Sequence, residues 1–150
     1  MSQTISPLVK EMITQNRVSC GFALSMIDQT HAGLRMSPEA NSVGFIYRHI
    51  GETTLLFGYF FGIPPTVENT TMGKQDTGQG QDISESRELI EKGYQLFEEL
   101  AQTATDNFWM EEVDTPFFGK VSRFRLFSHV MYHIGHHSGQ IAMTISKMKP

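Results

Sequence analysis

Apolar residues recur at helical spacing along four long segments of the chain. The first segment runs from about Pro7 to Ile27 and the second from about residue 38 to 61. The third follows Ser84, and the fourth spans about Val121 to Lys147. No segment shows sustained strand-like alternation, although the irregular stretch EEVDTPFFG at 111–119 could pair locally. The pattern predicts an all-α four-helix bundle.

Residues that favour helix ends punctuate this pattern. Ser6-Pro7 and Ser37-Pro38 each place an N-cap residue before a proline, whose missing N–H costs nothing at the first helical position. Gly62-Ile63-Pro64-Pro65 then stops the second helical segment. We therefore expect the first two helices to begin at these two Ser-Pro pairs.

A polar segment of about nineteen residues, PPTVENTTMGKQDTGQGQD at 64–82, separates the second and third helices. It is too long for a tight hairpin, and a structureless loop of this length is usually functional, mobile or a crossover. We interpret it as a crossover that returns along the bundle, so that the second and third helices run parallel. The expected architecture is a single domain over residues 1–150 with up-down-down-up topology.

Composition narrows the classes of function. A net charge of −4 and a pI of about 5.8 argue against a nucleic-acid surface, which needs clustered Lys and Arg. No apolar run approaches the ~18–20 residues of a membrane span. The N-terminus has no export signal, so we expect a cytoplasmic protein. The lone Cys20 cannot supply a thiolate cluster, and it has no basic neighbour to activate it.

Four of the six histidines lie within nine positions, in HVMYHIGHHSGQI at 129–141. With His129 at 0° and about 100° per residue, the apolar stripe of this helix centres near about 120–130°. His137 then falls at about 80° and His133 at about 40°, while His136 falls at about −20°. His133 and His137 therefore lean toward the core, and His129 and His136 lean away.

The two inward histidines are four positions apart, the spacing that places two imidazoles on one face to bind one metal ion. The alternative is two partly buried histidines bonded to neighbouring carbonyls and acids. His49, in IYRHIGE on the otherwise apolar second helix, adds a third inward imidazole. A buried neutral imidazole needs two partners or a metal. Three such residues fit a bundle-core metal site with open coordination positions.

Two polar residues flank this set. Glu52, one turn beyond His49, could orient a ligand, act as a base or face solvent. Gln140 could line the rim of the site or make no contact there. The sequence leaves these alternatives open.

These residues resemble the DinB family, the DinB/YfiT-like four-helix-bundle metalloproteins. The segment YHIGHHSGQI, preceded by IYRHIGE, matches a last helix that carries a His-x-x-x-His pair and commonly ends His-His-Arg-Gly-Gln-Ile. The resemblance covers nearly the whole chain in helix order, length and crossover. It implies that His49, His133 and His137 hold one divalent metal ion, nickel or zinc, and that His136 is not a ligand. It also implies that homodimers are frequent.

The chain departs from the family pattern at two positions. Ser138 stands where many members have Arg, and Tyr132 where many have Asn. The first change removes a cation from the expected edge of the site, which puts in doubt a substrate held there by an anionic group. The ligand set is untouched.

Some relatives are transferases that use a low-molecular-weight thiol such as bacillithiol, mycothiol or glutathione. The leading hypothesis is therefore a metal-dependent thiol S-transferase, in which the ion favours the thiolate and presents it to an electrophile. The same site could instead run metal-hydroxide hydrolysis. A non-catalytic metal-binding or stress-response protein would be favoured by a fourth protein ligand, with Glu52 the first candidate. A metal-free interaction bundle would need His49 to point away from the other two histidines.

The second helical segment carries more large apolar side chains than one helix face buries in a small bundle. A surplus apolar face usually marks an interface, so we predict a homodimer. The alternative is that the crossover or the first helix covers this face. The residues concerned are Phe45, Tyr47, Leu55, Phe57, Tyr59, Phe60 and Phe61.

Overall fold

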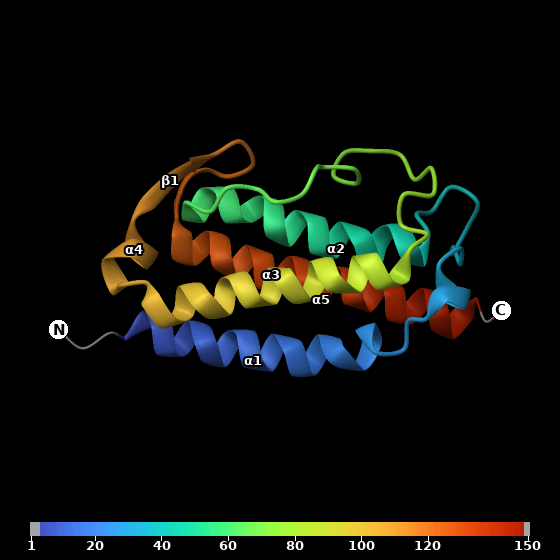
Figure 1. Ribbon diagram of the computed structural model, residues 1–150, viewed down its shortest axis with the longest axis horizontal. Helices are drawn as coiled ribbons and strands as arrows, with labels where there is room; N and C mark the ends of the chain where they lie inside the picture. The colour runs from blue at the N-terminus through green and yellow to red at the C-terminus, as the bar shows by residue number, and fades with distance from the viewer. Residues whose placement is uncertain (1–3, 149–150) are drawn as a thin grey trace.

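The computed structural model describes residues 4–148 and forms a helical bundle (Figure 1). Its long helices are α1 (Ile5–Leu24), α2 (Val43–Phe57), α3 (Ile83–Thr103) and α5 (Arg123–Lys147). The shorter elements are the 3-10 turns η1 (Gln29–His31) and η2 (Gly58–Phe61), helix α4 (Asp106–Met110), and strands β1 (Glu112–Thr115) and β2 (Gly119–Ser122). The predicted all-α bundle is thus accompanied by one small β-hairpin.

The direction of the chain can be followed in Figure 1 by its colours. Helices α1 and α5 run from the left end of the bundle to the right, whereas α2 and α3 both run from right to left. Residues 62–82 pass along the outer side of α2 and carry the chain back to the right-hand end, where α3 begins. We refer to residues 62–82 as the crossover.

The start of α1 differs from the prediction that Ser6 is its N-cap. The helix begins at Ile5, and Ser6 lies in its first turn, buried in the core. The Ser6 hydroxyl donates to the carbonyl of Ala104 at 2.7 Å and accepts from the indole N–H of Trp109 at 2.9 Å. These long-range hydrogen bonds hold the hydroxyl away from the helix end.

The predicted start of the second helix at Ser37-Pro38 is wrong. Residues 37–40 form a turn, and α2 begins at Val43 after the extended N-cap residue Ser42, whose hydroxyl accepts from the N–H of Phe45. The Asp76 carboxylate of the crossover accepts from both the N–H and the hydroxyl of Ser42, at 2.8 and 2.7 Å. A tertiary contact therefore selects this cap over the Ser-Pro pair.

Three other helix ends shift by a few residues. α1 stops at Leu24 rather than near Ile27, and α2 continues to Phe61 only as the 3-10 turn η2. Val121 lies in β2, and α5 starts after the N-cap Ser122. The stretch expected to pair locally does so: β1 and β2 form an antiparallel hairpin with Val113 opposite Val121.

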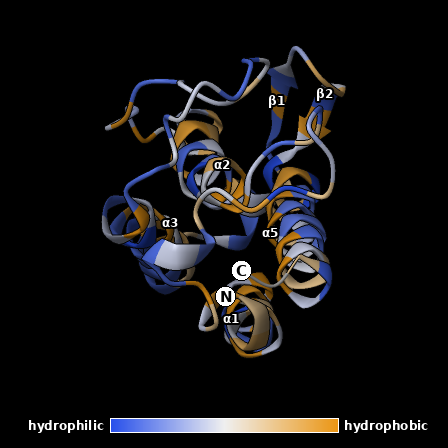
Figure 2. Cartoon of the chain, turned by 90° about the vertical axis from the view of Figure 1, so that its right-hand side faces the viewer, coloured by the Kyte–Doolittle hydropathy of each residue, from blue (hydrophilic) through white to orange (hydrophobic). Residues whose placement is uncertain are grey.

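The core lies between the four long helices, which Figure 2 shows end on around one centre. Its largest fully buried side chains come from α1, α2, α3, α4 and α5, including Ile13, Ile50, Phe97, Trp109 and Phe127. Among the described residues, no helix combines the length and the apolar character that crossing a membrane would require.

The apolar side chains of α2 and η2 are mostly buried inside the chain itself. Phe45, Tyr47, Phe57 and Phe61 are all buried, whereas Tyr59 is 66% exposed. Helix α2 packs between α3 and α5, and the crossover runs along its outer side. The surplus face that motivated the homodimer is therefore largely covered within one chain, and the homodimer stays a prediction.

Candidate metal centre

Three histidines from two helices meet in the bundle. His49 comes from α2, and His133 and His137 come from successive turns of α5. One ring nitrogen of each lies within 4.8 Å of the other two. The ring centroids of His49 are 4.9 Å from that of His133 and 4.8 Å from that of His137. His49 therefore points toward the pair. A metal-free interaction bundle was expected to have His49 pointing away from it, so the structure does not support that alternative.

The spacing of these nitrogens suits a metal ion. The Nε2 atoms of His49 and His133 are 3.0 Å apart. Two imidazole nitrogens bound to a tetrahedral ion at ~2.0–2.1 Å lie roughly 3.3 Å from each other. Imidazole nitrogen suits zinc, nickel, copper and iron, whereas magnesium and calcium prefer oxygen. The three residues thus fit a divalent transition-metal ion.

Burial keeps these imidazoles neutral. Together with the neighbouring His137, it lowers the pKa of His133 to about 3 and that of His49 to about 4. Burial also lowers the pKa of His137, partly opposed by its hydrogen bond to Gln140. Neutral imidazoles keep the nitrogen lone pairs that a metal ion needs, so the site is ready for metal near pH 7 without losing protons.

Glu52 is fully buried, which excludes the solvent-facing alternative. One carboxylate oxygen accepts from the guanidinium of Arg48 at 2.6 Å and from the Thr70 hydroxyl, and the other accepts from the Thr70 N–H and the Thr71 hydroxyl. Burial alone would raise the pKa of Glu52, but these hydrogen bonds outweigh it and the pKa is lowered. The ionised carboxylate is surrounded by donors and is not part of the three-histidine group.

Thr71 links this carboxylate to the histidines, and no pattern in the sequence points to this role. Its buried hydroxyl donates to Glu52 at 2.8 Å and lies 3.1 Å from Nδ1 of His49. The Thr53 hydroxyl makes a longer contact with the same nitrogen, at 3.3 Å. Thr71 belongs to a Thr- and Gly-rich loop where a threonine is unremarkable, so only the path of the crossover reveals its role.

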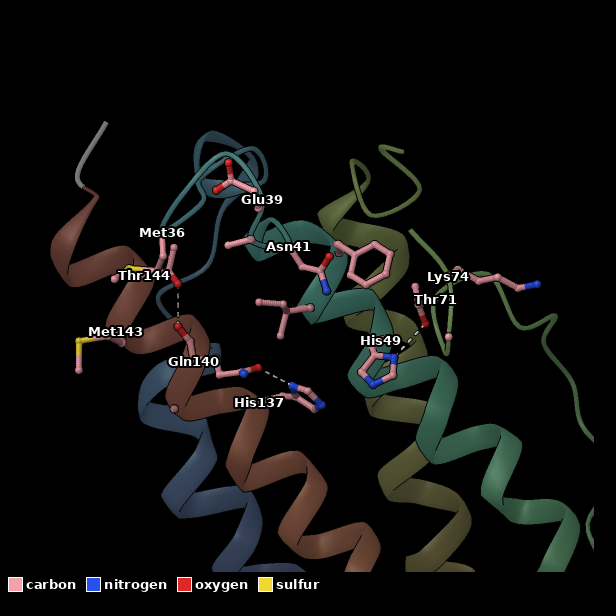
Figure 3. A pocket seen from close by; sticks show the side chains of 15 residues that line it. Met36, Glu39, Asn41, His49, Thr71, Lys74, His137, Gln140, Met143 and Thr144 are labelled. Atoms are coloured by element: carbon pink, nitrogen blue, oxygen red, sulfur yellow. Dashed lines mark hydrogen bonds between the residues drawn. The ribbon is translucent and has the colours of Figure 1, made fainter. Parts of the chain in front are cut away.

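On α5, Gln140 holds the ring of His137 as Thr71 holds that of His49. Its side-chain oxygen accepts from Nδ1 of His137 at 2.6 Å, one turn along α5. This contact can be followed in Figure 3, where Gln140 and His137 point toward each other. Of the alternatives left open by the sequence, Gln140 therefore both contacts a predicted ligand and lines the pocket.

A pocket of about 800 Å³ opens beside the histidines, between the start of α2 and the end of α5 (Figure 3). His49, His137 and Thr71 are among its lining residues. The volume is in the usual range for small-molecule sites. The rest of the lining combines apolar and polar side chains, including Met36, Phe45, Ile46, Met143, Asn41, Glu39 and Lys74.

The other two histidines of α5 do not join the group. His136 is exposed beside Tyr132, as the helical wheel predicts. His129 was expected to lean away from the core, but it is half-buried: its ring lies 4.7 Å from that of Phe118 and 5.7 Å from that of Phe57. The hairpin turn covers it, a contact that a wheel drawn for one isolated helix cannot contain.

Ser138 does not lie at the edge of the site. It is buried, its hydroxyl donates to the carbonyl of Ile134 at 2.7 Å, and it lines a groove against Cys20 and Ala23 of α1. Ser138 is not among the residues that line the pocket, so its replacement of an arginine does not remove a cation from the pocket edge. Tyr132, the second departure, is 64% exposed.

Comparisons with known proteins agree with this fold. A family model described as the DinB superfamily matches residues 23–141. No curated protein sequence matches the chain. Among solved structures, a DinB-like protein from Bacillus cereus is 19% identical with a TM-score of 0.72, and the match covers 98% of this chain and 94% of that one.

Two further solved structures are similar. A conserved protein from Enterococcus faecalis is 12% identical with a TM-score of 0.71, covering 98% of each chain. YfiT from Bacillus subtilis, described as a probable metal-dependent hydrolase with an unusual four-helix bundle topology, is 13% identical with a TM-score of 0.70. That match covers 99% of this chain and 90% of YfiT. At these identities the likeness concerns the fold alone.

Proposed function

We propose that this chain, which belongs to the DinB superfamily, is a metal-dependent enzyme that transfers a small cellular thiol to an electrophile. His49, His133 and His137 would hold one divalent ion, nickel or zinc, beside the pocket. Such an ion favours the thiolate form of a bound thiol at neutral pH. The observation that carries the proposal is a group of three neutral imidazoles, without a fourth protein ligand among the described residues, next to a pocket of about 800 Å³.

The residues around the pocket would each contribute to this chemistry. Three neutral ligands leave the positive charge of the ion uncompensated, which stabilises an anionic sulfur. Phe45, Ile46 and Met143 give the pocket an apolar wall, and excluding water there strengthens the attraction between opposite charges. Gln140 and Thr71 hold the imidazole rings in place.

The position of Glu52 favours transfer over hydrolysis. Hydrolytic metal sites commonly use a carboxylate as a base toward water, and Glu52 is the carboxylate next to the histidines in sequence. Its oxygens already accept four hydrogen bonds from Arg48, Thr70 and Thr71. A thiolate is itself the nucleophile and needs no such base. Hydrolysis remains the second candidate because YfiT, of similar fold, is described as a metal-dependent hydrolase.

The test is to incubate metal-loaded protein with each common cellular thiol and an epoxide or aryl halide, and to follow loss of the electrophile. We expect metal-dependent turnover with one thiol, lost in His137→Ala and kept in His136→Ala, the matched control on the exposed side of α5. Equal rates in all three proteins would overturn the transferase proposal. Turnover of an ester without thiol, lost in the same variant, would replace it with hydrolysis.

We also propose a homodimer, now on a different face. Val18 and Phe22 of α1 and Met26 in the turn that follows the helix are spaced four positions apart, and they are 55%, 77% and 48% exposed. An apolar stripe of this kind usually marks an interface. Light scattering at micromolar concentration should give a dimer mass for the unchanged protein and a monomer mass for Phe22→Ser. A monomer mass for the unchanged protein would contradict the dimer.

A further inference from the structure

A chain of three buried groups leads from Glu52 to the metal centre. The Glu52 carboxylate accepts from the Thr71 hydroxyl at 2.8 Å, and the same hydroxyl lies 3.1 Å from Nδ1 of His49. Glu52 is 0% exposed and Thr71 is 2% exposed. Glu52 and His49 belong to α2, whereas Thr71 belongs to the crossover, so one residue of a long loop bridges two positions of a helix.

Counting hydrogens along this chain fixes the direction of each hydrogen bond. An ionised carboxylate only accepts, and a threonine hydroxyl has a single hydrogen to donate. Since that hydrogen goes to Glu52, the Thr71 oxygen can only accept from His49. Nδ1 of His49 must then carry the hydrogen, and the lone pair of the neutral ring is on Nε2. The contact with Thr53 is compatible, because its hydroxyl can also accept.

We propose that Glu52 and Thr71 are positioning residues that hold His49 in the tautomer with its hydrogen on Nδ1, so that Nε2 is the metal-binding atom. Nε2 is the nitrogen that lies 3.0 Å from Nε2 of His133. A hydrogen-bond acceptor on the other ring nitrogen orients a metal-binding histidine and raises its basicity. The inference rests on the metal-binding part of the proposed function and is independent of the thiol chemistry.

The crossover is attached firmly enough to serve this purpose. The Asp76 carboxylate accepts from Ser42 at the start of α2 and pairs with Arg35 at 3.0 Å. Gly80 and Gly44 approach so closely that a Cβ on Gly44 would lie 2.3 Å from the carbonyl oxygen of Gly80. Because these attachments do not involve Thr71, removing its hydroxyl should leave the path of the crossover intact.

The chain offers a matched set of variants. Thr71→Val removes the hydroxyl that bridges Glu52 and His49 while nearly keeping the shape of the side chain. Thr70→Val removes a hydroxyl bound to the same carboxylate that makes no contact with His49, and it is the control. Thr71→Ser restores the hydroxyl and should rescue the effect. A merely structural role of the carboxylate network would make the two valine variants alike.

The first measurement is the tautomer of His49 in the metal-free protein, from the ¹⁵N shifts of its ring by long-range NMR correlation. We expect hydrogen on Nδ1 in the unchanged protein, in Thr70→Val and in Thr71→Ser, and a rise of the other tautomer in Thr71→Val. Hydrogen on Nε2 in the unchanged protein would overturn the inference. This result depends neither on the folding of a variant nor on the binding of a metal ion.

The second measurement is zinc affinity by competition with a chromophoric chelator. Thr71→Val should bind zinc about 10–100-fold more weakly, which is the usual effect of removing the hydrogen-bond partner of a metal-binding histidine. Thr70→Val and Thr71→Ser should stay within about threefold of the unchanged protein. Equal weakening in both valine variants would contradict a specific role for Thr71. An unchanged protein that binds neither zinc nor nickel would defeat the proposed function, while the tautomer would still decide whether Glu52 and Thr71 position His49.

Discussion

The two helices that build the candidate metal centre hold their histidines by different means. On α5, His137 is oriented by Gln140, a residue of the same helix that is exposed to solvent. On α2, His49 is oriented by a fully buried carboxylate acting through a hydroxyl of the crossover. The first arrangement is local, so its loss should change the free energy of unfolding little. The second ties the site to the packing of the whole bundle, so it should respond to mutation as part of the core.

The strongest test of this contrast is to remove one orienting residue next to His49 on α2 and one next to His137 on α5. Glu52→Ala leaves Arg48, Thr70 and Thr71 without their acceptor in a buried position. Breaking a buried, hydrogen-bonded charge pair costs about 3–5 kcal/mol in free energy of unfolding. Gln140→Ala, at an exposed site, should stay within about 0.5 kcal/mol. Urea denaturation of the metal-free proteins measures both, and equal losses would refute the contrast.

Two glycines test whether the crossover side is tightly packed while the α5 side is open. A Cβ on Gly44 meets the backbone of Gly80, whereas nothing lies within 4 Å of a Cβ on Gly135 in α5. Gly44→Ala should lower the free energy of unfolding by about 1–3 kcal/mol through overpacking. Gly135→Ala should raise it by roughly 0.5–1 kcal/mol, because alanine favours the helix interior. If Gly44→Ala proves neutral or stabilising, the crossover is looser than described.

Acid should destabilise the metal-free protein through the buried histidines. The folded-state pKa of His49 is about 4 and that of His133 about 3, against 6.5 for an ordinary histidine. Between these values the unfolded chain binds more protons than the folded protein. The free energy of unfolding should therefore be unaffected by these histidines above pH 6.5 and should decrease as the pH falls below that value. The metal affinity of the folded protein should hold through most of this range and decline only as the pH approaches the lowered pKa values of these histidines, because protons and metal compete for the same nitrogens.

The measurement is the free energy of unfolding at pH 6.5 and at pH 4.5, the ordinary pKa values of histidine and glutamate. His133→Asn should show a smaller loss between the two than the unchanged protein. His136→Asn, which replaces the exposed neighbour, should show the same loss as the unchanged protein. A loss that is the same in all three would mean that the buried ring does not carry this dependence.

Local patterns predicted the α5 side of the site, and long-range contacts decided the rest. Helical spacing placed His133 and His137 on one face because the geometry of one helix suffices for that. His49 was predicted from an imidazole on an apolar helix and from the family resemblance. Thr71 could not be found in this way, since its contact depends on where the crossover lies in space.

The errors have the same origin. The Ser37-Pro38 pair is a reasonable helix start by local chemistry, but Asp76 of the crossover stabilises Ser42 as the N-cap instead. His129 was placed outside by a wheel that ignores the hairpin turn, where Phe118 covers it. In each case a residue distant in sequence supplied the deciding contact.

The most direct test of the central claim is a zinc or nickel titration of the purified protein and three single variants. One ion per chain should bind to the unchanged protein and to His136→Ala, and stoichiometric binding should be lost in His49→Ala and His137→Ala. Thermal stability should rise with added metal only in the two proteins that bind it. Binding that survives in His49→Ala, or that is lost in His136→Ala, would contradict a centre built from His49, His133 and His137.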